Sequence, residues 1–183
     1  MKVTPTTLPE VLLIEPRVFP DSRGHFFESW MSSRYQEAEI TAPFVQDNFS
    51  RSTQDTLRGL HFQEPKGQGK LITILSGKIY DVVVDVRSDS PRYREWIGIE
   101  LNGDEPKQLW IPPGFAHGFC VLSEQADFIY KCTEFYTPET EHSIHWNDPE
   151  LAIDWPLDVP ILSEKDAAAP FLADVPVLPR MSA

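Results

Sequence analysis

The sequence Ile79–Arg87 reads IYDVVVDVR and alternates with a period of two residues. One face of this segment carries large apolar or aromatic side chains, namely Tyr80, Val82, Val84 and Val86. The other face carries Ile79, Asp81, Val83 and Asp85. Because successive side chains of an extended chain point to opposite faces, this alternation predicts a β-strand.

Further segments have the residue types of strands, and turn residues such as Ser76-Gly77 and Asn102–Asp104 separate them. These predicted strands are Val11–Val18, His25–Trp30, Phe44–Arg51, Leu57–Gln63, Lys70–Leu75, Glu95–Leu101, Lys107–Ile111, Gly118–Leu122, Asp127–Phe135 and Ser143–Trp146. Many short strands at regular spacing favour an all-β sandwich or barrel.

Helical signals are few. Ser32–Ile40 is predicted to form a short helix with Ser32 or Ser33 as its N-cap, and Ser163 is predicted to cap a single turn over Ser163–Ala168. From Asp148 onward the chain is rich in proline and shows little alternation, which is typical of an extended strap. We expect one domain over residues 1–183, with its core at 11–147 and a C-terminal strap at 148–183.

The charge balance constrains the partners of the chain. It has 183 residues, with 16 Lys+Arg against 28 Asp+Glu and a net charge of −12. This balance argues against a nucleic acid or an anionic membrane surface as the main partner. An anionic ligand would have to be held by a locally basic pocket. The 17 prolines fit a β-rich protein whose loops are stiffened.

The cysteines and the apolar runs bear on location. Cys120 and Cys132 do not make a disulfide framework, so we expect free buried thiols and a reducing compartment. The apolar block Val11–Ile14 is too short for a signal peptide, and no run approaches the ~20 apolar residues of a membrane span. A cytoplasmic protein without membrane contact is the resulting expectation.

The segment Leu57–Gln63, LRGLHFQ, places Arg58 and His61 three residues apart. This odd offset puts the two side chains on opposite faces of a regular strand. Either one of them faces solvent, or Gly59 allows a β-bulge that directs both inward, and such bulges are frequent beside active sites. We adopt the bulge as the hypothesis.

Metal binding is the obvious rival chemistry for a β-barrel with several histidines. The sequence contains no His-x-His pair, and His142 and His145 fall on opposite faces of a strand. A preformed metal site needs several convergent ligands, so this spacing disfavours one. We also find no nucleophile elbow, no dinucleotide-binding fingerprint and no phosphate loop. The carboxylates of Asp47, Asp81 and Asp85 are expected to be solvated or to support hairpins. The remaining candidates are acid–base groups, namely His61, His117, Tyr130 and Lys70.

Longer blocks of sequence carry a family resemblance. They are Phe44–Asn48, Leu57–Gln63, Asp81–Arg87, Gln108–Pro112, Gly114–Phe119, Trp146–Asp148 and Leu162–Asp166. Occurring in this order, they resemble the dTDP-4-dehydrorhamnose 3,5-epimerases, enzymes of dTDP-L-rhamnose synthesis. The match runs from about Val11 to Ala169, and several blocks in order are far more specific than one short motif.

The resemblance implies a cupin-like jelly-roll barrel that works without a cofactor or metal and binds a sugar nucleotide in its mouth. It assigns His61 as the general base and Asp166 as the carboxylate that orients it. Tyr130 becomes the acid on the opposite face of the sugar, and Lys70 lies near the substrate ketone.

The resemblance also implies a homodimer and a set of substrate-binding residues. These are Phe19, Arg23, Glu28, Gln46, Asn48, Arg58, Lys70, His117, Glu141 and Lys165, with Phe135 and Tyr136 near the base or sugar. We expect an N-terminal strand to be exchanged between subunits, which would place Arg23 and Glu28 in the pocket of the neighbour. One departure from the family pattern is His25, where an apolar residue is more usual.

The expected reaction is epimerisation of dTDP-4-dehydro-6-deoxy-D-glucose at carbons 3 and 5, through an enolate. The ketone at carbon 4 acidifies the hydrogens on both neighbouring carbons, and inversion needs a base and an acid on opposite faces of the ring. The alternatives are an epimerase of a deoxysugar pathway that inverts carbon 3 only, a metal-dependent cupin enzyme, and a catalytically silent binder of sugar nucleotides.

Overall fold

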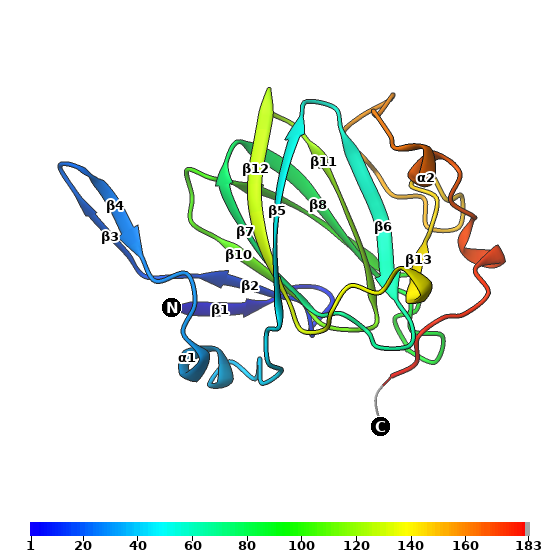
Figure 1. The fold of residues 1–183 in the computed structure, drawn as a ribbon, viewed down its shortest axis with the longest axis horizontal. Coiled ribbons are helices and arrows are strands. Elements are labelled where there is room, and N and C mark those ends of the chain that lie inside the picture. The colour runs from blue at the N-terminus through cyan, green and yellow to red at the C-terminus, as the bar shows by residue number, and fades with distance from the viewer. Residues whose placement is uncertain (182–183) are drawn as a thin grey trace.

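A computed structural model describes residues 1–181 and shows two antiparallel sheets packed face to face (Figure 1). The first sheet has the strand order β1 (Lys2–Pro5), β2 (Leu12–Glu15), β10 (Gln108–Ile111), β7 (Lys70–Ser76), β12 (Gln125–Cys132) and β5 (Gln46–Thr53). The second has the order β13 (Glu141–Ser143), β6 (Leu57–Gln63), β11 (Phe115–Val121), β8 (Lys78–Asp85) and β9 (Trp96–Asn102). The predicted all-β jelly-roll barrel is confirmed.

Strand β8 shows how the alternating pattern is used. Ile79 and Val83 lie in the core between the two sheets, where they meet side chains such as Ile72 and Phe128. Val82 and Val84 point the other way into a second apolar cluster. Both faces of β8 are therefore buried, because the strand lies inside a sheet that is covered on each side.

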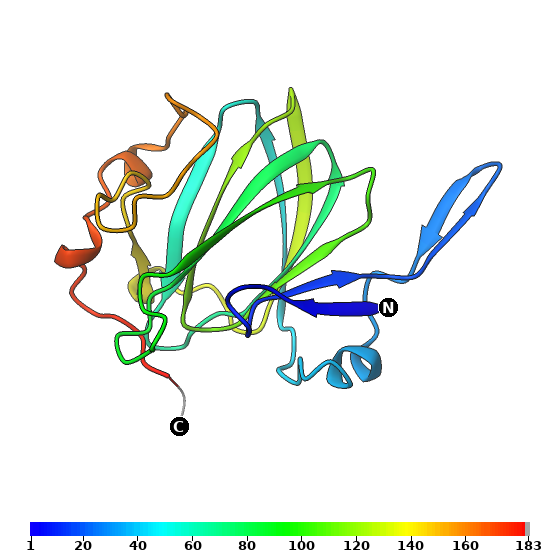
Figure 2. The ribbon, with the colours of Figure 1, turned by 180° about the vertical axis from the view of Figure 1, so that it is seen from behind.

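The second cluster is closed by the C-terminal strap, which is coloured orange to red in Figure 1 and Figure 2. Trp155, Leu172 and Val175 of the strap pack against the outer face of the five-stranded sheet. The strap also contains α2 (Glu164–Ala167) and the 3-10 helix η2 (Leu172–Asp174). As predicted, Ser163 caps α2, because its Oγ accepts a hydrogen bond from Asp166 N at 3.1 Å.

The carboxylate of Asp85 lies on the core-facing side of β8, with Ile79 and Val83, and is not solvated. Asp85 is fully buried and is bonded to Arg87, whose Nε lies 2.9 Å from its Oδ1. A buried carboxylate persists when it is paired and hydrogen-bonded. Asp85 also accepts from Arg87 N at 3.0 Å and from Oγ of Ser90 at 2.6 Å in the turn between β8 and β9, so its expected role in supporting a hairpin is confirmed. Asp47 is exposed and pairs with Lys131 at 2.9 Å.

The N-terminal part differs most from the prediction. The expected strand Val11–Val18 is split into β2 and β3 (Val18–Asp21), and β1 was not predicted. Strand β3 pairs with β4 (Gly24–Phe27) in a hairpin that projects from the barrel (Figure 1, Figure 2).

Two helical elements complete the fold. Helix α1 (Ser32–Gln36) is shorter than predicted and follows Met31, whose extended backbone occupies the N-cap position without a side-chain cap. The prediction that Ser32 or Ser33 caps this helix is therefore wrong. The 3-10 helix η1 (Pro138–Thr140) leads into β13. No helix in residues 1–181 is long and apolar enough to cross a membrane. Cys120 and Cys132 are free and buried, as expected.

Candidate active site

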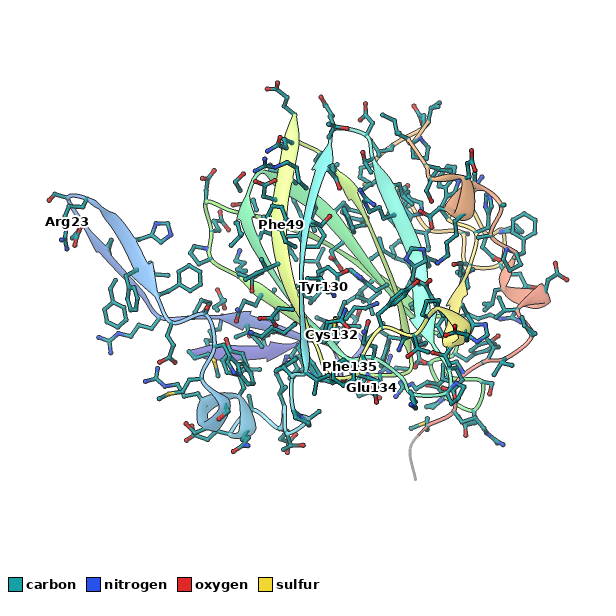
Figure 3. The ribbon with its side chains drawn as sticks, viewed as in Figure 1. Arg23, Phe49, Tyr130, Cys132, Glu134 and Phe135 are labelled. Atoms are coloured by element: carbon teal, nitrogen blue, oxygen red, sulfur yellow. The ribbon has the colours of Figure 1, made fainter. Side chains whose placement is uncertain are left out.

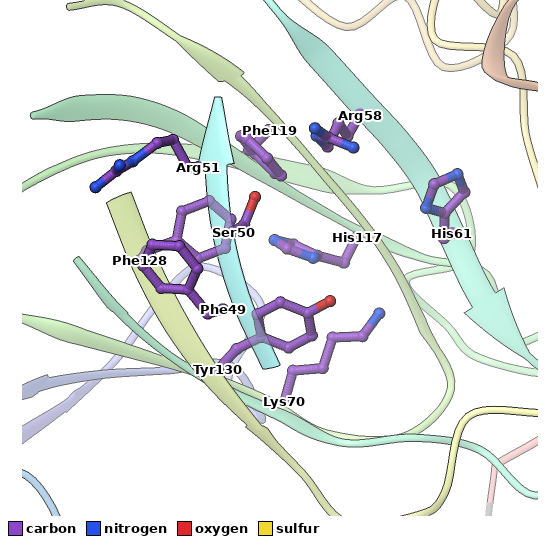
Figure 4. Close-up of a pocket in the computed structure, with 10 residues that line it drawn as sticks. All are labelled: Phe49, Ser50, Arg51, Arg58, His61, Lys70, His117, Phe119, Phe128 and Tyr130. Carbon is purple, nitrogen blue, oxygen red and sulfur yellow. The ribbon is translucent and has the colours of Figure 1, made fainter. Parts of the chain in front are cut away.

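A cavity of about 390 Å³ opens between the two sheets (Figure 4). Its walls come from β5, β6, β7, β11 and β12. The lining side chains are Phe49, Ser50, Arg51, Arg58, His61, Lys70, His117, Phe119, Phe128 and Tyr130. This set contains His61, Lys70 and Tyr130 together with the guanidinium groups of Arg51 and Arg58. Positive groups of this kind are needed if an acidic protein is to bind an anionic ligand.

Strand β6 delivers both Arg58 and His61 to this cavity because it is irregular at Gly59. The register between β6 and β11 shifts at this point, and Gly59 has a φ of +111°. A Cβ atom at residue 59 would stand 2.5 Å from the Cα atom of Gly118. Only glycine accommodates this backbone. The hypothesis of an inward-directing bulge is therefore confirmed.

His61 is bonded to a carboxylate of the strap. Its Nε2 lies 2.6 Å from Oδ1 of Asp166, and the hydroxyl of Ser163 donates to Oδ2 of Asp166 at 2.8 Å. Burial works to raise the pKa of Asp166, but the hydrogen bonds from His61 and Ser163 outweigh it and hold that pKa below its usual value. Asp166 is thus an ionised, fixed partner for the imidazole.

Tyr130 and Lys70 enter the cavity from the other sheet, on β12 and β7 (Figure 4). Burial raises the pKa of the Tyr130 phenol, so the group is held in its protonated form. Burial lowers the pKa of Lys70, because an enclosed ammonium loses hydration. The two sheets thus present a His–Asp pair on one side and a phenol with an amine on the other.

A second buried His–carboxylate pair lies beside the first. Nε2 of His117 is 3.0 Å and 2.9 Å from the two carboxylate oxygens of Asp81, and Asp81 is fully buried. The expectation that Asp81 is solvated is wrong, since Asp81 lies with Ile79 and Val83 on the face of β8 that points between the two sheets. In the sheet, His117 is the direct partner of His61, which brings both imidazoles to one wall.

Sequence reasoning missed several lining residues, of which the most informative are aromatic. Phe119 and Phe128 meet edge to face with their ring centroids 4.8 Å apart. Each lies two residues from a predicted site residue, since Phe119 follows His117 and Phe128 precedes Tyr130. The period of two was therefore a signal that could have found them. Ser50 and Arg51 were missed because nothing in their own pattern marks the strand edge they occupy.

Arg58 is held by a serine that was also not predicted. Its Nε donates to Oγ of Ser52 at 3.2 Å, and Ser52 is buried. This contact occupies the Nε–H of the guanidinium, and Arg58 still lines the cavity. A planar guanidinium presented in this way suits paired phosphate oxygens.

Other predicted binding residues form polar pairs outside the lining set. Nε2 of Gln46 donates to Oδ1 of Asn48 at 3.0 Å on β5. Lys165 forms an ion pair with Glu141, and Oη of Tyr136 donates to Oε2 of Glu141 at 2.8 Å. Burial works to raise the pKa of Glu141, but Lys165 and Tyr136 hold it below its usual value.

Phe19, Arg23 and Glu28 do not reach the cavity of their own chain. Arg23 lies at the end of the β3–β4 hairpin, well away from Tyr130 (Figure 3), and pairs at 2.7 Å with Asp21. Glu28 lies 3.4 Å from Arg34. Phe19 is exposed on the hairpin. The single chain therefore leaves this part of the predicted site apart from the rest.

The histidines do not gather around a common point that a metal could occupy. Within residues 1–181, no three side chains of His, Cys, Asp or Glu are placed to hold a metal ion. His142 instead bonds to the carbonyl oxygen of Glu64 at 3.0 Å and stacks on Phe62.

Comparisons with known proteins identify the family of this chain. The family model described as dTDP-4-dehydrorhamnose 3,5-epimerase matches residues 5–174. A relative of that name from Pseudomonas aeruginosa is 52% identical over 181 residues, covering 98% of this chain and 100% of its own. A crystal structure of the epimerase from Legionella pneumophila, in complex with dTDP-4-keto-L-rhamnose, is 52% identical with a TM-score of 0.96, covering 100% of this chain and 99% of its own.

A more distant structure is also similar. It is a 3'-monoepimerase from Streptomyces bikiniensis in complex with dTDP-quinovose, 34% identical with a TM-score of 0.87, and it covers 92% of this chain and 87% of its own. The family match over most of the chain and the identity of about half to full-length relatives lead to one assignment. The chain is an isomerase that belongs to the dTDP-4-dehydrorhamnose 3,5-epimerase family.

Proposed function

We propose that the protein inverts carbons 3 and 5 of dTDP-4-dehydro-6-deoxy-D-glucose by proton transfer between His61 and Tyr130. The observation that carries this proposal is that both residues line one cavity from opposite sheets. A ketone at carbon 4 makes the hydrogens on both neighbouring carbons acidic. Inversion removes a proton from one face of the ring and returns one to the other, which needs two groups on opposite sides.

His61 is suited to the role of base. A neutral imidazole is available near neutral pH and can accept a proton from carbon. The ionised carboxylate of Asp166 then stabilises the imidazolium that forms and fixes the orientation of the ring. Because Ser163 binds the second oxygen of Asp166, the carboxylate is held as well.

Tyr130 and Lys70 complete the chemistry from the other sheet. The raised pKa of Tyr130 keeps the phenol protonated until a strong base such as an enolate carbon forms beside it. The ammonium of Lys70 faces the cavity, where it stabilises negative charge on the carbon-4 oxygen (Figure 4). The loss of one such donor typically costs about 2.7–4 kcal/mol of barrier.

The nucleotide part of the substrate requires cations and polar groups near the mouth. Arg58 and His117 lie on the β6–β11 wall, where they can receive the diphosphate. Gln46, Asn48, Glu141 and Lys165 supply polar contacts for the remainder of the nucleotide. With a net charge of −12, the chain depends on this local cluster to hold an anionic ligand.

We also propose a homodimer in which the β3–β4 hairpins are exchanged. The hairpin projects from the barrel and exposes Phe19 and Phe26, of which Phe26 is 68% exposed. Apolar surface of this kind is usually covered by a partner. Exchange would bring Phe19, Arg23 and Glu28 to the cavity of the neighbouring subunit.

Co-expression of two inactive variants tests this exchange. In a heterodimer of an Arg23→Ala chain and a His61→Ala chain, both defects fall in the same cavity only if the hairpin crosses between subunits. The heterodimer then has one intact site, so the mixture should regain activity that neither homodimer shows. If light scattering finds monomers, or the mixture stays inactive, hairpin exchange is wrong.

A cytoplasmic location is proposed on the state of the thiols. Cys120 and Cys132 are both free and buried. Free cysteines are typical of compartments kept reducing. Cell fractionation followed by detection of the protein checks this proposal.

The deciding experiment for the reaction is incubation with the keto-sugar nucleotide in deuterated water. Deuterium at both carbon 3 and carbon 5 of an inverted product supports the double epimerase. Deuterium at carbon 3 alone would place the chain with single-site enzymes such as the 3'-monoepimerase it resembles. Binding without any exchange would overturn the proposed activity altogether.

A further inference from the structure

The carboxylate that orients His61 lies on the strap and not in the barrel. Asp166 belongs to α2, a helix of four residues. A helix this short has no stability of its own in water, so its position is set by the chain on either side of it. The location of the Asp166 carboxylate therefore depends on how the strap is attached before and after α2 (Figure 1).

The strap is bonded to the barrel on both sides of α2. Before the helix, Ile161 N donates to Asp55 O at 2.8 Å, and Leu57 N donates to Ile161 O at 3.0 Å. After the helix, His145 N donates to Pro170 O at 2.8 Å, and Leu172 N donates to Oδ2 of Asp148, the first residue of the strap, at 2.6 Å. Of these bonds, only the one from Leu172 depends on a side chain.

Asp148 is a buried carboxylate that the proposed mechanism does not use. It is 1% exposed, and all its side-chain bonds go to backbone N–H groups. Oδ1 accepts from Glu150 N at 2.8 Å and from Leu151 N at 3.0 Å, while Oδ2 accepts from Leu172 N. One carboxylate thus ties the turn that follows β13 to the part of the strap that follows α2. Hydrogen bonds to a charged acceptor are stronger than neutral ones, so this attachment is firm.

We propose that Asp148 is a positioning residue for the His61–Asp166 pair and acts through Leu172 and the strap. The inference rests on the proposed role of His61 as the base. Asp166 must meet His61 at 2.6 Å while Ser163 holds its other oxygen at 2.8 Å. A misplacement of about 1 Å caused far from the chemistry can lower a rate on the order of 100-fold.

A matched pair of variants tests the proposal. Asp148→Asn keeps the size of the side chain but replaces one accepting oxygen with an amide that cannot accept. Asp89→Asn is the control. Asp89 also holds the strap, accepting from Met181 N at 2.7 Å and from Nε of Arg180 at 3.2 Å, but these two strap residues follow α2 and η2 in the chain. We expect Asp148→Asn to lower kcat toward the ~100-fold of such a misplacement with a smaller change in KM, and Asp89→Asn to leave kcat unchanged.

The second readout does not need activity. The proton shared by His61 and Asp166 in a 2.6 Å hydrogen bond gives a far-downfield proton NMR signal, which is assigned by its loss in His61→Ala. The signal should shift or vanish in Asp148→Asn and persist in Asp89→Asn. If Asp148→Asn folds with an unchanged signal and an unchanged kcat, the positioning role is wrong. If the unmodified protein lacks exchange activity, the proposed function fails, while the NMR comparison still decides the role of Asp148.

A measurement on the unmodified chain covers the case in which Asp148→Asn does not fold. Native-state hydrogen exchange reports the free energy at which each amide opens. If Asp148 holds α2 through Leu172, the amides of Leu172 and Asp166 open together, with one shared dependence on denaturant. Opening of Asp166 at a free energy different from that of Leu172 would overturn the proposal.

Discussion

Nε2 of His61 lies 2.6 Å from Oδ1 of Asp166, although 105 residues separate them in the chain. One partner is on a barrel strand and the other on the strap that covers that strand from outside. The strap therefore closes the second apolar cluster and also supplies the charge that the proposed base needs. Stability and activity are linked through this one segment.

Replacement of Asp166 with asparagine should separate these two roles. The amide retains the shape of the side chain but cannot stabilise an imidazolium by charge. The same change beside the histidine of a serine-protease triad lowers kcat by about 10⁴-fold, and we expect a loss of up to that order here. The measurement is deuterium exchange at carbons 3 and 5, with circular dichroism to show that the fold is kept. A variant of undiminished rate would remove Asp166 from the mechanism.

The same substitution should change how stability depends on pH. The pKa of Asp166 in the folded protein lies below the ordinary aspartate value of 3.8. A depressed pKa means that the stabilisation is present above the unfolded value and is lost as pH falls through the folded value. The Tm difference between the unmodified protein and Asp166→Asn should therefore be constant near neutral pH and shrink below about pH 4. A difference that grows on acidification would contradict the assignment.

Tyr130→Phe should uncouple proton removal from inversion. His61 can still remove a proton and return it to the same face, so exchange with solvent continues. Inversion slows because the phenyl ring has no proton to deliver from the other face. Product analysis by proton NMR separates the two rates. Should inversion at both carbons proceed at the unmodified rate, the acid is another group.

Lys70→Arg should move the alkaline limit of activity. Burial lowers the pKa of Lys70 from 10.5 and raises that of Tyr130 from 10.0. Loss of charge from the amine is therefore expected at a lower pH than for an ordinary lysine, and loss of the phenol proton at a higher pH than for an ordinary tyrosine. A guanidinium stays charged in this range, so the alkaline limb of the kcat profile should shift upward in Lys70→Arg. Lys70→Met should instead lower kcat by the equivalent of about 2.7–4 kcal/mol. An alkaline limb unmoved in Lys70→Arg would mean that it reports a different group.

Gly59→Ala should damage the fold at the bulge. The new Cβ would lie 2.5 Å from Gly118 Cα and 2.6 Å from His117 O, and φ is +111°. Gly24→Ala is the control, because Gly24 also has a positive φ of +138° but no atom within 4 Å of an added Cβ. Backbone strain alone costs about 1–3 kcal/mol, and the control measures this strain without the steric clash. Chemical denaturation should show a clearly larger loss for Gly59→Ala, and equal losses would argue against the close approach of β6 and β11.

Local patterns were enough for the parts of the protein that depend on near neighbours in the chain. The alternation in Ile79–Arg87 predicted a strand with two distinct faces, and Ser163 was predicted as a helix cap from the residues beside it. The offset of Arg58 and His61 around Gly59 predicted a bulge. Each of these features follows from backbone geometry over a few residues, and so the sequence contains it directly.

The cover of each face was decided only by the tertiary structure. Asp81 and Asp85 resemble solvent-facing residues of an alternating strand, yet both are buried. Both lie with Ile79 and Val83 on the face of β8 that points between the two sheets, where the opposite sheet with Ile72 and Phe128 covers it. A period of two carries no information about which distant strand packs on that face. Water is excluded by whichever surface packs on a strand, so the burial of a charge and the partner that neutralises it arise only when distant elements meet.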